Sequence, residues 1–96
     1  MVVTQVEAHV SPDRWPELRE RYRSMTNALR RQLVRTYLLQ ATHDRTLWRI
    51  MTVWKSKEAL DEYLQSVETP GAFVLFRDVG AEPTRKIFEV AEYAPR

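Results

Sequence analysis

Three polar side chains lie at alternate positions in the valine-rich segment "VVTQVEAHV", residues 2–10. An extended chain turns Gln5, Glu7 and His9 to one face, because successive side chains of a strand point in opposite directions. A glutamate and a histidine on one face could hold a proton acceptor that works near neutral pH. Arg49, in another predicted strand, could supply a positive charge that stabilises an anion. His9, Glu7 and Arg49 are therefore the candidate catalytic residues.

The same side chains have a second interpretation. They could make hydrogen bonds or ion pairs across the contact between two copies of the chain, with no part in chemistry. A shift of one residue in strand pairing moves every side chain to the other face, so the sequence does not fix which face Arg49 takes. A pocket and an interface both remain open for this group.

Aromatic side chains form the second candidate group. The stretch "TVWKSKEALDEYL", residues 52–64, changes from a strand period to a helical period just after Trp54. We expect aromatic residues of this strand, the helix after it and a short third helix to converge, with one more from the first helix. The candidate substrate-binding residues are Trp54, Tyr63, Phe73, Phe76 and Tyr22. Such a cluster is either core or the wall of a pocket for a flat ligand, and Trp54 could be both.

Composition excludes several kinds of site. Metal sites need clustered donors, and the 96 residues include two histidines, His9 and His43, and no cysteine. The two glycines stand apart, so there is no glycine-rich phosphate loop. The arginines of residues 19–35 have Glu17 and Glu20 as counter-charges, which indicates a solvated helix face rather than a nucleic-acid surface. We expect no metal, no cofactor and no nucleic-acid partner.

Length and hydropathy predict a single domain over residues 1–96. No apolar run approaches the 18 or so residues of a membrane span, and the first ten residues do not form a secretory signal. We expect a cytoplasmic protein with no membrane partner.

The elements that must position these residues follow from periodicity. Alternation predicts strands at 2–10, 33–41, 46–54 and 85–93, with a tight turn at 42–45. Ser11 and Pro12 begin a helix whose apolar face is Trp15, Leu18, Tyr22, Met25 and Leu29, Ser56 caps a second, and Gly80 ends a third over 71–79. This order predicts an α+β, ferredoxin-like split βαβ fold. Its four-stranded antiparallel sheet has helices on one face and the first and third strands in the middle.

Both faces of this sheet are apolar. In the third strand, Leu47, Met51 and Val53 alternate with Trp48, Ile50 and Trp54, and the last strand likewise opposes Ile87 and Tyr93 to Phe88 and Val90. One layer of helices cannot cover both faces, and a second copy of the sheet is the simplest cover. We predict a homodimer that packs sheet on sheet.

Two segments resemble the antibiotic biosynthesis monooxygenase domain family, whose fold is a dimeric α+β barrel. They are "VWKSKEALDEYLQS", a strand that ends in tryptophan and leads through a short hinge into a helix, and "FRDVGAEPTRKIFEV". The resemblance implies a pocket between sheet and helices in each subunit. It also implies relatives that include cofactor-free oxygenases of aromatic polyketides and quinols, and haem-degrading enzymes.

From this resemblance we expect a cofactor-independent monooxygenase that acts on a reduced aromatic, such as a hydroquinone or an anthrone. The alternative is a non-catalytic dimer of the same fold that binds a small apolar ligand or serves a structural role. A cavity between sheet and helices would favour the enzyme, and a packed interior would favour the alternative.

Two other readings are disfavoured. Haem-degrading members resemble one another in an asparagine of the first strand, a tryptophan in the helix after the hinge and an iron-binding histidine in the short helix. In this sequence residues 5–7 of the first strand include no asparagine, and Tyr63 takes the place of the tryptophan. The histidine would fall near Phe76, and residues 70–80 contain no histidine. RNA-binding domains share the element order, but they need exposed aromatics on the first strand, which has none.

Overall fold

The computed structural model describes residues 1–27 and 33–95. The elements are β1 (Val2–His9), the 3-10 helix η1 (Pro12–Arg14), α1 (Trp15–Thr26), β2 (Leu33–Gln40), β3 (Leu47–Trp54), α2 (Lys57–Ser66), α3 (Gly71–Asp78) and β4 (Thr84–Glu89). The predicted inward position of Leu29 lies outside the described residues.

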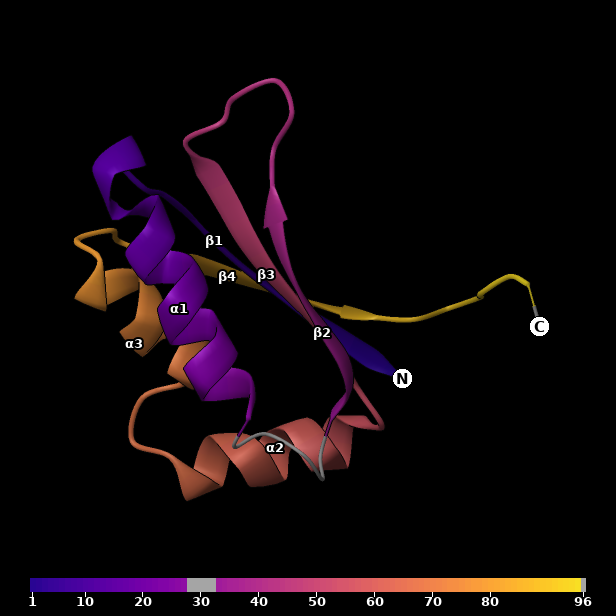
Figure 1. Ribbon diagram of the computed structural model, residues 1–96. Helices are drawn as coiled ribbons and strands as arrows, with labels where there is room; N and C mark the ends of the chain where they lie inside the picture. Colours follow the sequence, from indigo (N-terminus) through magenta and orange to yellow (C-terminus); the bar gives the residue numbers. More distant parts are fainter. Residues whose placement is uncertain (28–32, 96) are drawn as a thin grey trace.

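The strands form one antiparallel sheet in the order β2-β3-β1-β4. Figure 1 shows α1, α2 and α3 on one side of this sheet. The ferredoxin-like α+β fold is therefore confirmed, with β1 and β3 in the middle. No helix within the described ranges is long and apolar enough to cross a membrane.

The start of the first helix differs from the prediction. Ser11 precedes η1 rather than α1, and its hydroxyl donates to Asp13 at 2.6 Å instead of capping a helix. The first turn is tight because the Arg14 amide donates to the Ser11 carbonyl three residues back, at 2.9 Å. The other two helix signals are confirmed. Ser56 caps α2 by accepting a bond from the Ala59 amide at 3.1 Å, and Gly80 follows α3 with φ +80°.

The last strand is shorter than predicted. We expected it to reach residue 93, but β4 ends at Glu89. The register pairs Glu89 with Val2, so β1 has no further residues to pair with beyond one bond from the Val90 amide to the Met1 carbonyl at 3.0 Å. The tail after β4 leaves the body of the sheet, and Tyr93 on it is 58% exposed (Figure 1).

Burial alternates along the central strands and defines the two faces. The main core packs the helix face of the sheet against α1 and α3, and its fully buried side chains include Phe76, Leu18 and Ile50. A smaller cluster of Val2, Trp54 and Leu60 lies under α2. We call the other side of the sheet the open face. It carries Tyr37, Leu39 and Phe88 at 39%, 39% and 47% exposure.

Candidate functional site

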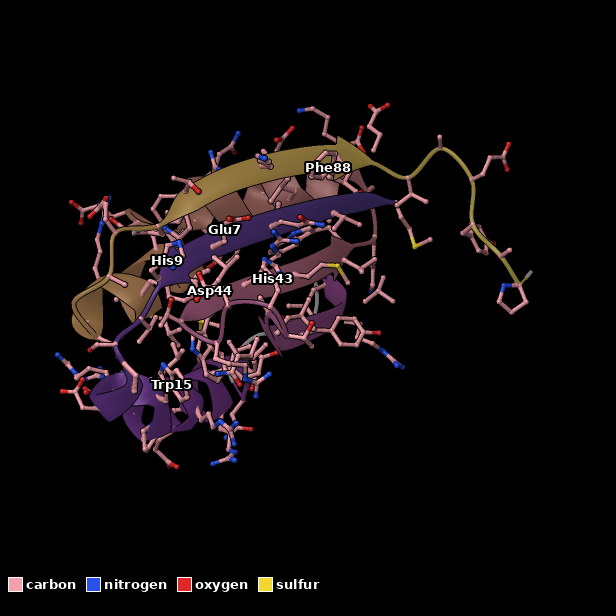
Figure 2. The ribbon with its side chains drawn as sticks, turned by 90° about the horizontal axis from the view of Figure 1, so that it is seen from above. Glu7, His9, Trp15, His43, Asp44 and Phe88 are labelled. Atoms are coloured by element: carbon pink, nitrogen blue, oxygen red, sulfur yellow. The ribbon has the colours of Figure 1, made fainter. Side chains whose placement is uncertain are left out.

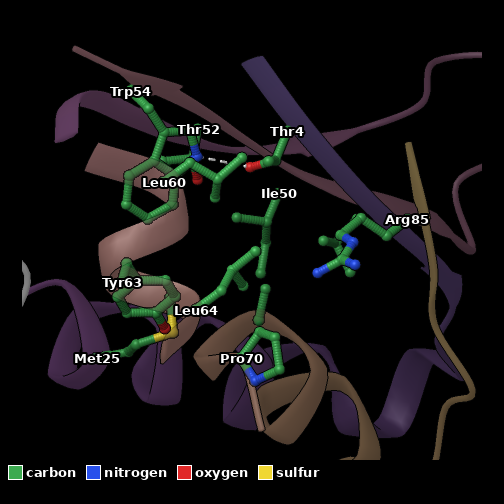
Figure 3. Close-up of a pocket in the computed structure, with 12 residues that line it drawn as sticks. Thr4, Met25, Ile50, Thr52, Trp54, Leu60, Tyr63, Leu64, Pro70 and Arg85 are labelled. Atoms are coloured by element: carbon green, nitrogen blue, oxygen red, sulfur yellow. Dashed lines mark hydrogen bonds between the residues drawn. The ribbon is translucent and has the colours of Figure 1, made fainter. Parts of the chain in front are cut away.

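A cavity lies between the helix face of the sheet and the three helices (Figure 3). Its walls are mostly apolar and include Val6, Ile50, Leu60 and Leu64. Its volume is about 40 Å³, and it is partly open to solvent. An engineered apolar cavity that binds benzene measures about 150 Å³. The closed part therefore holds less than one ring, and a larger ligand would have to extend through the mouth or move the walls.

Two aromatic side chains form one wall of the cavity. Trp54 and Tyr63 have ring centroids 5.0 Å apart with 36° between their planes. Trp54 is only 4% exposed, and its indole N–H donates to the Thr4 hydroxyl at 3.0 Å. The Tyr63 hydroxyl accepts a bond from the Gly71 amide at 2.9 Å, which ties α2 to the start of α3. Trp54 is thus a core residue on one side and a cavity wall on the other.

The floor of the cavity is polar, and no pattern within a single strand predicts this. The register places Thr36, Thr52 and Thr4 side by side across β2, β3 and β1. Thr4 and Thr52 line the cavity at 7% and 8% exposure. The Thr36 and Thr52 hydroxyl oxygens are 3.2 Å apart, and the Tyr22 hydroxyl donates to Thr36 at 3.2 Å. Thr4 and Thr52 share the parity of buried neighbours in β1 and β3, but only the register brings the three threonines together.

One charged side chain, Arg85, lines the cavity from β4 (Figure 3). It was missed because a basic residue on an edge strand looks like ordinary solvated surface. Its guanidinium carbon lies 5.8 Å from the centre of the Phe73 ring. No carboxylate of the described residues forms an ion pair with it, and the lining contains no aspartate, glutamate or histidine. Arg85 therefore offers the mouth an uncompensated positive charge.

The three candidate catalytic residues lie on the open face, away from this cavity. Glu7 and Arg49 are direct neighbours on β1 and β3 and form an ion pair of 2.7 Å. His9 is at the end of β1, where its Nδ1 lies 3.0 Å from the Thr46 hydroxyl. The structure brings Glu7 and Arg49 together, but it does not bring any of the three to the aromatic wall.

The hairpin beside His9 carries a second local network (Figure 2). The Asp44 carboxylate lies 3.6 Å from His9 Nδ1. It accepts bonds from the Thr46 hydroxyl at 2.7 Å and from the Thr46 amide at 3.1 Å, and these bonds hold the pKa of Asp44 below its usual value. These bonds stabilise the turn between β2 and β3.

Within residues 1–27 and 33–95, no three histidine or acidic side chains gather as a metal site would require.

The predicted aromatic cluster is divided between two places. Trp54 and Tyr63 wall the cavity, whereas Phe76 is fully buried in the main core and Phe73 packs against that core. Tyr22 also packs on the main core and reaches the cavity floor only through its bond to Thr36. Phe73 and Phe76 do not line the cavity because α3 packs them against the main core.

The first 77 residues match the model of the antibiotic biosynthesis monooxygenase family. This match covers most of the chain, which therefore belongs to that family. A comparison with curated protein sequences found no significant match.

Three solved structures with the same fold illustrate the range of proteins that this chain resembles. SnoaB, a cofactor-independent oxygenase from Streptomyces nogalater, is 16% identical over 99% of this chain and 97% of that chain, with a TM-score of 0.75. A mutant of MhuD with two manganese protoporphyrin IX molecules bound per active site is 20% identical over 100% of both chains, with a TM-score of 0.76. An antibiotic biosynthesis monooxygenase candidate from Deinococcus radiodurans is 14% identical over 100% of this chain and 98% of that chain, with a TM-score of 0.75. At such identities the likeness shows the fold.

The residues of this cavity do not fit a haem. The lining has no histidine, and Phe76, near the place of the expected iron ligand, is fully buried in the main core. The cavity of about 40 Å³ is also small beside the roughly 300 Å³ or more that sites for larger ligands provide.

Proposed function

We propose that this protein is a cofactor-independent monooxygenase of a small, electron-rich hydroquinone. The observation that carries the proposal is an apolar cavity walled by Trp54 and Tyr63, with Arg85 as the one charged side chain among its described lining residues. An aromatic ring suits the wall, and a phenolate oxygen suits an arginine that has no ion pair with any carboxylate of the described residues.

The chemistry needs no external reductant. Once deprotonated, a hydroquinone can give an electron to O2, and the two radicals can join at a ring carbon to form a hydroperoxide. Loss of water then breaks the O–O bond and removes the hydrogen of that carbon. A hydroquinone and O2 thereby become a hydroxyquinone and water, with the ring oxidised and O2 reduced.

The protein's part is to bind the ring, exclude water and favour the phenolate. Arg85 performs the last of these by attracting the anion, which lowers the pKa of a bound phenol. The described lining residues include no conventional base, so the proton leaves to solvent at the mouth beside Arg85. The size of the cavity favours one ring over the three fused rings of an anthrone.

The test is O2 consumption with 1,4-naphthohydroquinone and with a single-ring hydroquinone, corrected for the uncatalysed rate. Labelled dioxygen should place one of its two atoms in the organic product. Arg85→Gln should lower kcat/KM by about tenfold, equivalent to about 1.4 kcal/mol. Arg77→Gln is the matched control, because Arg77 also stacks on Phe73, at 5.5 Å, but does not line the cavity. Uptake no faster than the uncatalysed reaction would contradict the proposal.

The small cavity without a base also favours a second candidate, a non-catalytic protein that binds a small aromatic ligand. Saturable binding of the same probes, with no catalysed O2 consumption, would select this candidate over the enzyme.

We further propose that a second copy of the chain covers the open face. Support comes from the exposed Tyr37, Leu39 and Phe88 and from the Glu7–Arg49 pair, which could enter an interface with its charges already matched. A four-stranded face of this length covers roughly 500 Å². Two copies would bury at least about 1,000 Å², the lower range for a specific interface. Sedimentation showing only an 11.4 kDa species at tens of micromolar would contradict a homodimer.

A further inference from the structure

The row of threonines on the cavity floor is unusual for the middle of a sheet. The helix face of β1 and β3 is otherwise built from Val2, Val6, Ile50 and similar apolar side chains. Thr4 and Thr52 are direct partners in the register and lie side by side in this face. Valine would fill the same space without a polar atom. The two buried hydroxyls therefore need hydrogen-bond partners that valine would not.

The donors and acceptors can be followed along the row. Tyr22 donates to the Thr36 oxygen, which lies 3.2 Å from the Thr52 oxygen. If Thr36 donates to the Thr52 oxygen, the hydroxyl hydrogens of Tyr22 and Thr36 both have an acceptor. The hydroxyl hydrogen of Thr52 then has no acceptor in this row. Thr4 accepts from the Trp54 indole, so its own hydrogen is also left over.

These two hydrogens belong to buried hydroxyls that line the cavity. A buried donor without an acceptor is unfavourable, and a ligand oxygen placed over the floor would satisfy it. A pure hydrocarbon would leave both donors unsatisfied. Sites of this kind discriminate by the presence of the oxygen rather than by the size of the ring.

We infer that Thr4 and Thr52 form a recognition strip for an oxygen acceptor on the ligand, a ketone, quinone or phenolate oxygen. Tyr22 and Thr36 position the Thr52 hydrogen toward the cavity. This inference rests on the proposed function only in that the cavity is the ligand site. It assigns the specificity to neutral hydroxyl donors at the floor, while Arg85 acts at the mouth.

The test compares two one-ring probes of nearly equal shape, acetophenone with a carbonyl oxygen and ethylbenzene without one. Binding is followed by NMR titration of the tryptophan indole N–H signals, with Trp54 assigned through Trp54→Phe. Because ethylbenzene is the more hydrophobic probe, the quantity of interest is how the ratio of the two Kd values changes between wild type and variant.

Thr52→Val keeps the shape and removes the hydroxyl, and it should shift the Kd ratio about tenfold against acetophenone. Thr52→Ser keeps the hydroxyl and should leave the ratio near that of wild type. Tyr22→Phe should give a smaller shift, about threefold, because Thr36 can then turn its hydrogen elsewhere. Tyr37→Phe, on the open face, is the matched control and should give no shift.

An unchanged ratio in Thr52→Val would overturn the inference, as would an equal shift in Thr52→Ser. Either result would leave the cavity as the ligand site and the proposed oxygenase intact. Failure of wild type to bind either probe would also overturn the inference. The O2 consumption experiment would still decide the proposed function separately.

Discussion

The two faces of the sheet are made from the same strands and differ in the kind of polar group they hold. On β3, Thr52 is buried on the helix face, and its neutral hydroxyl is bonded to another hydroxyl. On the open face the same strand carries Arg49, whose charge is paired with Glu7 and remains partly exposed. Burial of a hydroxyl costs little free energy when the hydroxyl makes a hydrogen bond. Burial of a charge is tolerated only when an oppositely charged group lies beside it.

The proposed ligand site and the proposed contact between two copies thus lie on opposite faces of the sheet. The helix face holds a partly open cavity with hydroxyl donors at the floor and, among the described residues, one arginine at the mouth. The open face holds exposed apolar side chains around a matched ion pair. We therefore expect substitutions on the two faces to change different measured properties.

The largest expected difference is between two phenylalanines. Phe76→Ala should lower the free energy of unfolding by about 3–5 kcal/mol, because Phe76 is fully buried and leaves a cavity. Phe88 is 47% exposed on the open face, and Phe88→Ala should cost less than about 1 kcal/mol in the monomer. Urea denaturation at low protein concentration measures both. Equal losses would show that the open face is as much a core as the helix face.

Next comes the test of assembly. Leu39→Glu should weaken self-association by at least about 100-fold, near 2.7 kcal/mol, because it would bury between two copies a second carboxylate beside Arg49, whose charge Glu7 already matches. Val74→Glu is the control, since Val74 is exposed to a similar degree, 42% against 39%, but lies on α3. Sedimentation equilibrium measures both variants. Dissociation by Val74→Glu instead would move the interface to the helices.

The third prediction concerns Trp54, which belongs to both core and cavity. Trp54→Phe should lower the free energy of unfolding by about 1–3 kcal/mol, because it loses volume and the bond to Thr4. It should also remove most of the tryptophan fluorescence change on binding 1,4-naphthohydroquinone under nitrogen. Trp15→Phe and Trp48→Phe are the matched controls. A lowered melting temperature with an intact ligand response would assign Trp54 to the core alone.

The smallest expected effect is that of the open-face ion pair. Glu7→Gln should lower the free energy of unfolding by about 0.5–1 kcal/mol, because the pair is partly exposed and screened. Thermal denaturation at two salt concentrations measures it. A hundredfold loss of oxygenation in this variant, with the fold intact, would instead support the assignment of Glu7 as a catalytic base.

The sequence predicted the architecture well, because strand and helix periods are local signals. The alternation of residues 46–54 and the Ser56 cap correctly located β3 and α2. The end of β4 was wrong, because it depends on where its partner β1 begins. For the site, Trp54 and Tyr63 were identified from the change of period between them. Phe73 and Phe76 were grouped with them because the short helix was expected to converge with β3 and α2, whereas α3 packs both residues against the main core.

What the amino-acid sequence determined by itself was which residues share a face within each strand: Thr4 with Val6, Glu7 with His9, and Thr52 with Trp54. Only the tertiary structure decided which face met the helices and which residues stood beside one another across strands. Side-chain alternation is a property of a single extended segment, whereas register and helix packing join segments far apart in the chain. For that reason Glu7 and Arg49 came to lie opposite each other on the open face. For the same reason three threonines from separate strands came to form one floor under the aromatic wall.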